Sequence, residues 1–249
     1  MSTDLDAFYS SETVDVWKQI IGESLHYHFG YFQGNEELEV GLRQTVKNFY
    51  PHIPLGAQVL DVGCGWGGPA IMLAKERHCA VQGITISEAQ VTYCQDISLD
   101  VWHCNIEQEQ ISGTYDVVFM LEVLSHIHNK ARVLAKLRTL APRLVISMHC
   151  VADNSDTPRT VFGGSMELIS KSEFVQALEA AGWHIKSMRN RRFQSMRTLI
   201  LWKQNLERAY GKQPLPGHLD ALYKLTETAL RSPHLWCRSF PLIDIVAEA

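Results

Sequence analysis

A chain of 249 residues is long enough for one large α/β domain, and its formal net charge of −4 argues against an extended nucleic-acid-binding surface. No apolar run approaches the about 18 residues of a membrane span, and the first residues lack the basic and apolar segments of a signal peptide. The six cysteines show no zinc-type spacing, so we expect reduced thiols, no metal site and a cytoplasmic location.

Residues 1–54 are predicted to form an N-terminal helical cap. Ser10-Ser11-Glu12-Thr13 can cap a first helix, and a second helix is expected over residues 36–49. Between them lies an aromatic cluster at residues 26–32. Its side chains either pack the cap onto the domain or cover a bound cation, and Tyr31 is a candidate acceptor-binding residue.

Residues 58–77 predict a strand, a glycine turn and a helix. The apolar run at residues 59–62 ends abruptly in glycine, as a buried parallel strand does before a tight turn. Pro69 then suits the first turn of a helix. The glycines of the turn, which let a ligand approach the backbone closely, are Gly63, Gly65, Gly67 and Gly68.

This turn also satisfies the glycine spacing of NAD-binding proteins, so the ligand has to be decided from its neighbours. An NAD site requires an acidic residue about 20 positions further on, but the stretch Gly83-Ile84-Thr85-Ile86-Ser87 around the end of the second strand has no acid before Glu88. Asp61, just ahead of the turn, would repel a pyrophosphate and favour a cationic ligand. We therefore predict S-adenosylmethionine (SAM), which carries an ammonium and a sulfonium.

Val-Leu-Asp-Val-Gly-Cys-Gly-x-Gly at residues 59–67 resembles the first motif of class I SAM-dependent methyltransferases. Tyr-x-x-Gly-Tyr-Phe from Tyr27 and Gly-Ile-Thr-Ile-Ser-x-x-Gln from Gly83 are similar to one branch of them. That branch contains cyclopropane fatty acid synthases, tocopherol methyltransferases and sarcosine or phosphoethanolamine methyltransferases. The resemblance covers residues 26–150 well and the C-terminal third in outline. It implies an α/β fold with a Rossmann-like sheet, mostly parallel, whose last strand is antiparallel.

The resemblance also implies which side chains contact SAM. Thr85 and Gln90 would meet its ribose and methionine portions, and Asn105 would meet adenine. Their alternative roles are a strand-end hydroxyl, a solvated helix residue and a turn residue, respectively. The complete expected set is Tyr27, His28, Asp61, Gly63, Gly65, Gly67, Thr85, Gln90, Asn105, Ile106 and Leu121.

Strand and helix signals alternate through the predicted core, residues 55–192. This alternation predicts a parallel sheet covered on both faces, with ligands at the carboxyl ends of its strands. Strands are expected at residues 58–62, 80–85, 99–103, 115–120 and 143–148, and helices at residues 69–77, 87–97, 130–140 and 172–181. Residues 151–166 lack periodicity and are predicted to be a mobile loop on the acceptor side.

Three candidate catalytic residues lie at these strand ends. Glu122 and His126 follow the fourth strand, and His149 ends the fifth. Methyl transfer chiefly needs alignment and exclusion of water, and it needs a base only if the attacking atom must lose a proton. Either histidine could be that base, whereas a capping or packing role is the alternative for His126.

Relatives that make cyclopropanes hold bicarbonate with a cysteine, a glutamate and a histidine. The histidine is retained here as His149, but Phe29 stands at the cysteine position and Ser125 at the glutamate position. The resemblance therefore implies methyl transfer without cyclopropane formation.

The C-terminal third is expected to add two strands, at residues 183–192 and 239–246. A helical insertion at residues 193–236, broken near residues 211–216, would lie between them and cover the acceptor pocket. Within this insertion, Trp202 is a candidate acceptor-binding residue.

A basic cluster lies where the sixth strand meets this insertion. It consists of Arg189, Arg191, Arg192 and Arg197. The cluster is either a solvated edge strand or a clamp for an anionic acceptor, a carboxylate or a diphosphate, in which Arg197 is the chosen candidate.

The sequence thus predicts a single-domain methyltransferase that transfers the methyl group of SAM to O, N or C of a small-molecule acceptor, in our preference a natural product. The alternatives are a lipid, quinone or isoprenoid-diphosphate methyltransferase, an NAD(P)-dependent oxidoreductase and a non-catalytic SAM-binding module. We expect no nucleic-acid partner and no stable membrane insertion. The sequence gives no indication of the oligomeric state.

Overall fold

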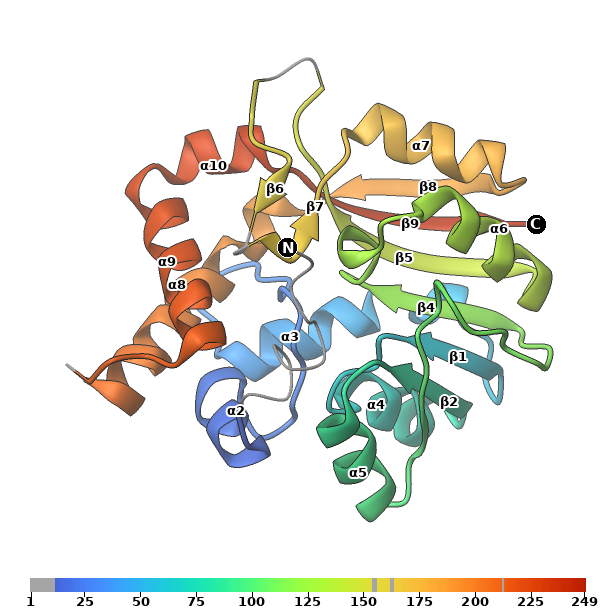
Figure 1. Cartoon of the computed structure of the whole chain (residues 1–249), viewed down its shortest axis with the longest axis horizontal. Helices are drawn as coiled ribbons and strands as arrows, with labels where there is room; N and C mark the ends of the chain where they lie inside the picture. Colours follow the sequence, from blue (N-terminus) through green and yellow to red (C-terminus); the bar gives the residue numbers. More distant parts are fainter. Residues whose placement is uncertain (1–11, 154–155, 162–163, 212) are drawn as a thin grey trace.

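The protein is described here by a computed structural model that covers residues 12–153, 156–161, 164–211 and 213–249. A seven-stranded sheet lies beside a separate layer of helices (Figure 1). Among the described helices, none is both long enough and apolar enough to span a bilayer.

The sheet has the strand order β3-β2-β1-β4-β5-β9-β8. Neighbouring strands from β3 to β5 are parallel, whereas β9 lies between β5 and β8 and is antiparallel to both. The prediction of a mostly parallel sheet with an antiparallel last strand is therefore confirmed. The strands are β1 (Gln58–Val62), β2 (Ala80–Thr85), β3 (Asp100–His103), β4 (Val117–Leu121), β5 (Arg143–His149), β8 (His184–Asn190) and β9 (Leu242–Glu248).

Four helices follow the strands of the core: α4 (Gly68–Arg77), α5 (Glu88–Asp96), α6 (Lys130–Leu140) and α7 (Lys171–Ala180). Side-chain caps explain where three of them begin, because each satisfies a free backbone N–H. Ser87 accepts from the N–H of Gln90 and Asn129 from that of Arg132, and Ser170 forms a reciprocal capping box with Glu173.

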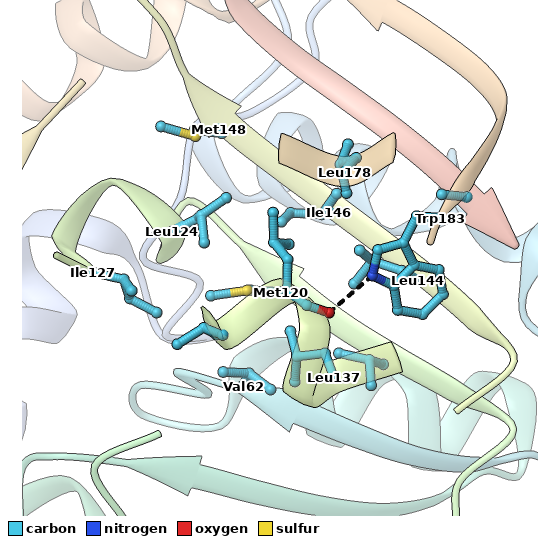
Figure 2. Close-up of a cluster of buried hydrophobic side chains, with 14 of the residues drawn as sticks. Val62, Met120, Leu124, Ile127, Leu137, Leu144, Ile146, Met148, Leu178 and Trp183 are labelled. Atoms are coloured by element: carbon cyan, nitrogen blue, oxygen red, sulfur yellow. Dashed lines mark hydrogen bonds between the residues drawn. The ribbon is translucent and has the colours of Figure 1, made fainter. Parts of the chain in front are cut away.

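The largest buried cluster lies between the sheet and α6 and α7 (Figure 2). All five residues of β4 are buried, as expected for a central parallel strand that is covered on both faces. Met120 and Leu144 of adjacent strands pack here with Leu137 of α6. Trp183 closes the cluster and donates its indole N–H to the carbonyl oxygen of Leu134 at 3.0 Å.

The predicted N-terminal cap and the predicted insertion pack together as one helical layer. It contains α2 (Val14–Ile21), α3 (Leu38–Lys47), α8 (Arg192–Tyr210), α9 (Gly217–Arg231) and α10 (Pro233–Ser239). Its apolar cluster joins segments far apart in sequence, with Trp17 from α2, Trp202 from α8 and Leu222 from α9. The glycine-turn residue Trp66 belongs to the same cluster, so this layer lies against the predicted SAM site.

Several predicted boundaries differ from the structure. The sixth strand was expected to reach residue 192, but it ends at Asn190 and α8 begins at Arg192. Ser239 was expected to begin the last strand, but it ends α10, because Pro233 starts a short helix that the prediction lacked. Two short strands, β6 (Thr160–Val161) and β7 (Met166–Glu167), form a hairpin within the predicted loop.

The remaining short elements are two 3-10 helices, η1 (Tyr50–His52) and η2 (Leu124–His126). Of the predicted capping segment, Ser10 and Ser11 lie outside the described residues, as do residues 154–155 and 162–163 of the predicted loop. Thr13 occupies the N-cap position of α2 without a side-chain hydrogen bond to the helix.

Candidate active site

A cavity of about 230 Å³ opens between the carboxyl ends of the sheet strands and the helical layer. It brings together most of the predicted site residues. Those that line it are Tyr27, His28, Asp61, Gly63, Gly65, Thr85, Gln90, Asn105, Ile106, Leu121, Glu122, His126, His149 and Trp202. Gly67, Tyr31 and Arg197 are not among its lining residues.

The glycine turn after β1 has the left-handed backbone that the sequence predicts. The φ angles of Gly63, Gly65 and Gly67 are +70°, +57° and +82°. A Cβ atom on Gly63 would lie 2.4 Å from a methyl carbon of Val123, and one on Gly67 would lie 2.5 Å from a methyl carbon of Leu99. A Cβ atom on Gly65 would meet nothing within 4 Å. Gly63 and Gly67 are thus needed for the turn, and Gly65 leaves open space at the cavity.

Asp61 places a carboxylate beside this turn. The residue is 3% exposed, and its Oδ2 atom has no hydrogen-bond partner among the described residues. Burial raises the pKa of its carboxyl group to about 7. A buried carboxylate oxygen without a partner fits a cationic ligand group, because a cation would supply both the missing hydrogen bond and the missing charge.

Thr85 and Gln90 are joined at the end of β2. The Thr85 hydroxyl donates to Gln90 Oε1 at 2.7 Å and accepts from the N–H of Ser87 at 3.3 Å. Gln90 is 4% exposed, so its alternative as a solvated helix residue is wrong. The side-chain carbonyl of Gln90 accepts the hydrogen bond from Thr85, so its amide N–H groups are the donors that it can offer to a ligand.

Asn105 combines a turn role with a place in the cavity wall. Its Oδ1 atom accepts from the N–H of Glu107 at 3.0 Å, as in a local turn. The side chain nevertheless belongs to the lining, beside Ile106. The turn role and the predicted cofactor contact are therefore compatible.

The aromatic cluster of the cap is held by histidines. His28 Nδ1 lies 3.1 Å from the carbonyl oxygen of Phe29, which can only accept, so Nδ1 carries the proton. Its Nε2 atom lies 3.1 Å from Nδ1 of His26, and burial lowers the pKa of His28 to about 3. The Tyr27 hydroxyl lies 2.9 Å from Nε2 of His218 on α9. Sequence reasoning missed His218, because its partner lies 191 positions away.

His126 and the segment between β6 and β7 meet at the wall of the cavity. Nδ1 of His126 lies 2.8 Å from the carbonyl oxygen of Ser165, so this nitrogen carries a proton and Nε2 is the basic nitrogen. Burial lowers the pKa of His126 to about 4. The ring is therefore neutral at physiological pH, with its lone pair on Nε2.

His149 has both ring nitrogens engaged. Arg192 can only donate, so its Nη2 donates to His149 Nδ1 at 3.0 Å. Nε2 of His149 then carries the proton and lies 3.4 Å from Glu122 Oε2. Burial, with Arg192 and Arg191 nearby, holds the pKa of His149 well below its usual range. Because its lone pair is bound by a guanidinium, His149 is a poor base candidate.

Glu122 belongs to a buried ion-pair network that holds the cap on the sheet. Its Oε1 accepts from Arg191 Nη2 at 2.8 Å and from the N–H of Phe29 at 3.0 Å. Arg191 also pairs with Asp244 of β9 at 2.7 Å and donates to the carbonyl oxygen of Phe29 at 2.8 Å. Glu122 has a φ of +62°, a strained conformation for a non-glycine residue that directs its carboxylate to these partners.

The basic cluster matches the solvated edge strand of one alternative only at Arg189, which lies exposed on β8. Arg191 and Arg192 are both fully buried, and Arg192 lines the cavity. Arg197 instead donates to the carbonyl oxygens of Glu36 and Asn35, at 2.8 and 3.0 Å. These contacts attach α8 to the cap and leave Arg197 away from the cavity.

Tyr31 also lies away from the cavity, with the guanidinium of Arg189 5.3 Å from its ring centroid. Residues that no motif identified complete the lining instead, from α9, from α10 and its C-cap, and from the β6–β7 hairpin. They include Val161, Met166, Leu225, Trp236 and Phe240. The only sequence signal for this region was helical periodicity, which does not distinguish lining residues from core residues.

Comparison with known proteins identifies relatives of this chain. Residues 10–214 match the family described as mycolic acid cyclopropane synthetase. The 27-O-demethylrifamycin SV methyltransferase of Amycolatopsis mediterranei (strain S699) is 29% identical over 231 residues, which cover 83% of each chain.

Solved structures share the whole fold at low sequence identity. The cyclopropane synthase MmaA2 from Mycobacterium tuberculosis superposes with a TM-score of 0.85 at 16% identity, covering 99% of this chain and 97% of that one. Coclaurine N-methyltransferase, bound to N-methylheliamine and S-adenosylhomocysteine (SAH), gives a TM-score of 0.81 at 17% identity, covering 100% of this chain and 83% of that one.

Proposed function

Because the chain belongs to the mycolic acid cyclopropane synthetase family and is a SAM-dependent methyltransferase, we propose that it methylates a small natural-product acceptor whose reacting atom loses a proton to His126. One observation carries this proposal. A single cavity is lined both by the Asp61–Gly65 segment and by His126, so donor and acceptor would share one space. The rifamycin-methylating relative supports an acceptor of natural-product type.

The residues present fit SAM at the sheet side of the cavity. Asp61 would hold the ammonium group, because its Oδ2 atom is buried without a partner. Gly65 would let the ligand lie against the backbone, and Gln90 would donate its amide N–H groups. Tyr27 and His28 would lie against the cofactor from the cap. When bound, SAM supplies an electrophilic methyl group on a sulfonium.

His126 would act on the acceptor. Its Nδ1–H is anchored by the Ser165 carbonyl oxygen, which fixes the ring and leaves Nε2 as the nitrogen that takes a proton. A neutral imidazole can remove a proton from a hydroxyl or an amine as the new bond forms. Glu122 and His149 would position the site, because both are bound within the arginine network.

Two residues favour methyl transfer without ring closure. The resemblance implies that cyclopropane-forming relatives hold bicarbonate with a cysteine and a glutamate. Phe29 and Ser125 occupy those two positions here. Phe29 has no ionisable group and packs edge-on against His149, with ring centroids 4.7 Å apart. Ser125 offers a hydroxyl in place of a carboxylate. An isoprenoid diphosphate is a poorer acceptor candidate, because Arg197 is occupied by the cap and Arg192 is the single cationic side chain among the lining residues described.

The proposal is tested by titration and by an acceptor screen. We expect SAM to bind with micromolar affinity and NADH not to bind, measured by isothermal titration calorimetry. Mass spectrometry should then find a methyl-sized mass gain in at least one hydroxylated or aminated natural-product scaffold. Binding of SAM with no methylation across a broad panel would instead favour a non-catalytic module.

Replacement of His126 then tests the base. We expect His126→Gln to lower kcat by about 10²–10⁴-fold, the usual contribution of a general base, with little change in the Kd for SAM. His149→Gln is the matched control, and it should lower kcat less. A larger fall in kcat for His149→Gln than for His126→Gln would reject the assignment.

A further inference from the structure

Arg191 and Arg192 are adjacent, and both are fully buried, but their surroundings differ in charge. Arg191 forms ion pairs with Asp244 and Glu122, at 2.7 and 2.8 Å. Two carboxylates therefore surround its guanidinium. Arg191 does not belong to the cavity lining.

Arg192 lines the cavity, and all its hydrogen-bond partners are neutral. Its Nε atom donates to the carbonyl oxygen of Phe240, and its Nη2 atom donates to His149 Nδ1 at 3.0 Å. Nη1 is buried and has no partner among the described residues. Glu122 acts on Arg192 electrostatically, but its carboxylate is already bound by Arg191. A buried guanidinium is costly to leave without a counter-charge of its own, so a bound anion would stabilise this arrangement.

The side chains around Arg192 define where that anion would lie. The guanidinium carbon lies 5.2 Å from the ring centroid of Phe29 and 5.9 Å from that of Trp236, both of which line the cavity. The indole N–H of Trp236 is also buried without a partner in the described part of the chain. Two residues that line the cavity thus each carry a buried donor that lacks an acceptor among the described residues.

Building on the proposed function, we propose that Arg192 binds a carboxylate group of the methyl acceptor, with the Trp236 indole N–H as a second donor. The Arg192 guanidinium would balance the single negative charge of a carboxylate, and the two donors would bind its two oxygen atoms. A diphosphate carries more charge than these groups can balance, and it would face Asp61 and Glu122 in the same cavity. Burial lowers the pKa of Arg192 to about 10, so the guanidinium stays protonated at neutral pH.

Binding of benzoate and benzamide to the SAH-loaded full-length protein tests this subsite. The two probes share a ring and differ in charge. We expect isothermal titration to give benzoate an affinity at least about tenfold higher than that of benzamide, as for a hydrogen-bonded charged group. Arg192→Gln should abolish this preference, whereas Arg189→Gln, on the exposed face of β8, should retain it.

Two further variants separate binding from folding. Trp236→Phe keeps the aromatic ring and should weaken benzoate several-fold while SAH affinity stays unchanged. Arg192→Lys keeps the charge and should retain part of the preference if Arg192→Gln does not fold. Equal affinity of the wild-type protein for benzoate and benzamide would overturn the inference, as would displacement of benzoate by millimolar bicarbonate, which would identify a site for a small free anion.

The acceptor screen provides a readout that separates this inference from the proposed function. Each candidate acid is offered together with its methyl ester. We expect the ester to lose at least about tenfold in kcat/KM, through KM. If esters are methylated as well as acids, only the carboxylate subsite fails. If SAH does not bind to the wild-type protein at all, the proposed function itself fails.

Discussion

Asp61 links cofactor binding to pH. Its carboxyl pKa rises from an ordinary 3.8 to about 7 because it is buried, and a cationic ligand binds the ionised form. We expect the Kd for SAM to fall about tenfold per pH unit between pH 5 and 7, and to level off above pH 7. Asp61→Asn should raise the Kd and remove this dependence, measured by calorimetry across pH. Asp116→Asn is the control, since Asp116 instead accepts from the N–H of Gln58.

The same carboxyl group affects the stability of the ligand-free protein in the opposite direction. Its folded-state pKa lies above the unfolded value, so between about pH 4 and 7 the folded state binds more protons. The free energy of unfolding should therefore fall as pH rises through this window, and it should fall less for Asp61→Asn. Urea denaturation of both proteins at pH 5 and 7 checks the sign. A steeper fall for Asp61→Asn than for the wild type would contradict it.

Gly63 and Gly65 form a matched pair for substitution by alanine. Both have a left-handed backbone, so each alanine is strained by about 1 kcal/mol. The Gly63 Cβ atom would also collide with Val123, whereas the Gly65 Cβ atom would enter the open space of the cavity. We expect Gly63→Ala to lower Tm more, and Gly65→Ala to weaken SAM binding with the smaller loss of Tm. Calorimetric titration and thermal denaturation of both variants separate the two effects. Equal affinities for SAM in the wild type and Gly65→Ala would show that the ligand lies elsewhere.

At the scale of elements, Arg191, which follows β8, joins the residue after β4, the strand β9 and the N-terminal cap through one guanidinium. Arg191→Met should lower the free energy of unfolding by about 3–5 kcal/mol, because Glu122 and Asp244 would remain buried without a cation. Arg189→Met, whose side chain is 46% exposed, should change it by less than about 1 kcal/mol. Urea unfolding measures both variants, and similar losses for the two arginines would disprove a special role for Arg191.

The sequence was sufficient for the elements whose signals are local. The apolar run of β4 and the cap residues of α5, α6 and α7 lie within a few positions of the structure they specify. The β6–β7 hairpin has only two residues in each strand, which is too short for an alternating pattern. The separate helix α10 was not predicted, although Pro233 is a helix-start signal.

The residues of the candidate site also differ in whether a local sequence signal could predict their role. Asp61 and the glycines were predictable because the turn that contains them is continuous in sequence. The state of His149 was not, because Arg192, which binds its lone pair, lies 43 positions away. The burial of Arg191 could not be predicted either, because its carboxylate partners lie 53 and 69 positions away. Arg197 and Tyr31 had suitable chemistry, but only the packing of α8 on the cap reveals that they are directed away from the cavity.

For the whole molecule, the cavity between the sheet and the helical layer means that a ligand contacts both. SAH should stabilise the protein by about 2.7 kcal/mol at one hundred times its Kd. Hydrogen exchange should slow both at the carboxyl ends of β1 and β2 and in α8 and α9, while α7, which supplies no lining residue, should change little. Protection limited to the sheet would indicate that the helical layer does not close over the ligand.

The position of β9 has a consequence for how the enzyme is made. Every other strand of the sheet is synthesised earlier, yet β8 reaches the sheet only through β9, which also supplies Asp244 to Arg191. On the ribosome, a chain that lacks residues 242–248 has no strand with which β8 can pair. It also lacks Asp244, one of the two carboxylates that form ion pairs with Arg191. The sheet can therefore be completed only after the last strand has been synthesised.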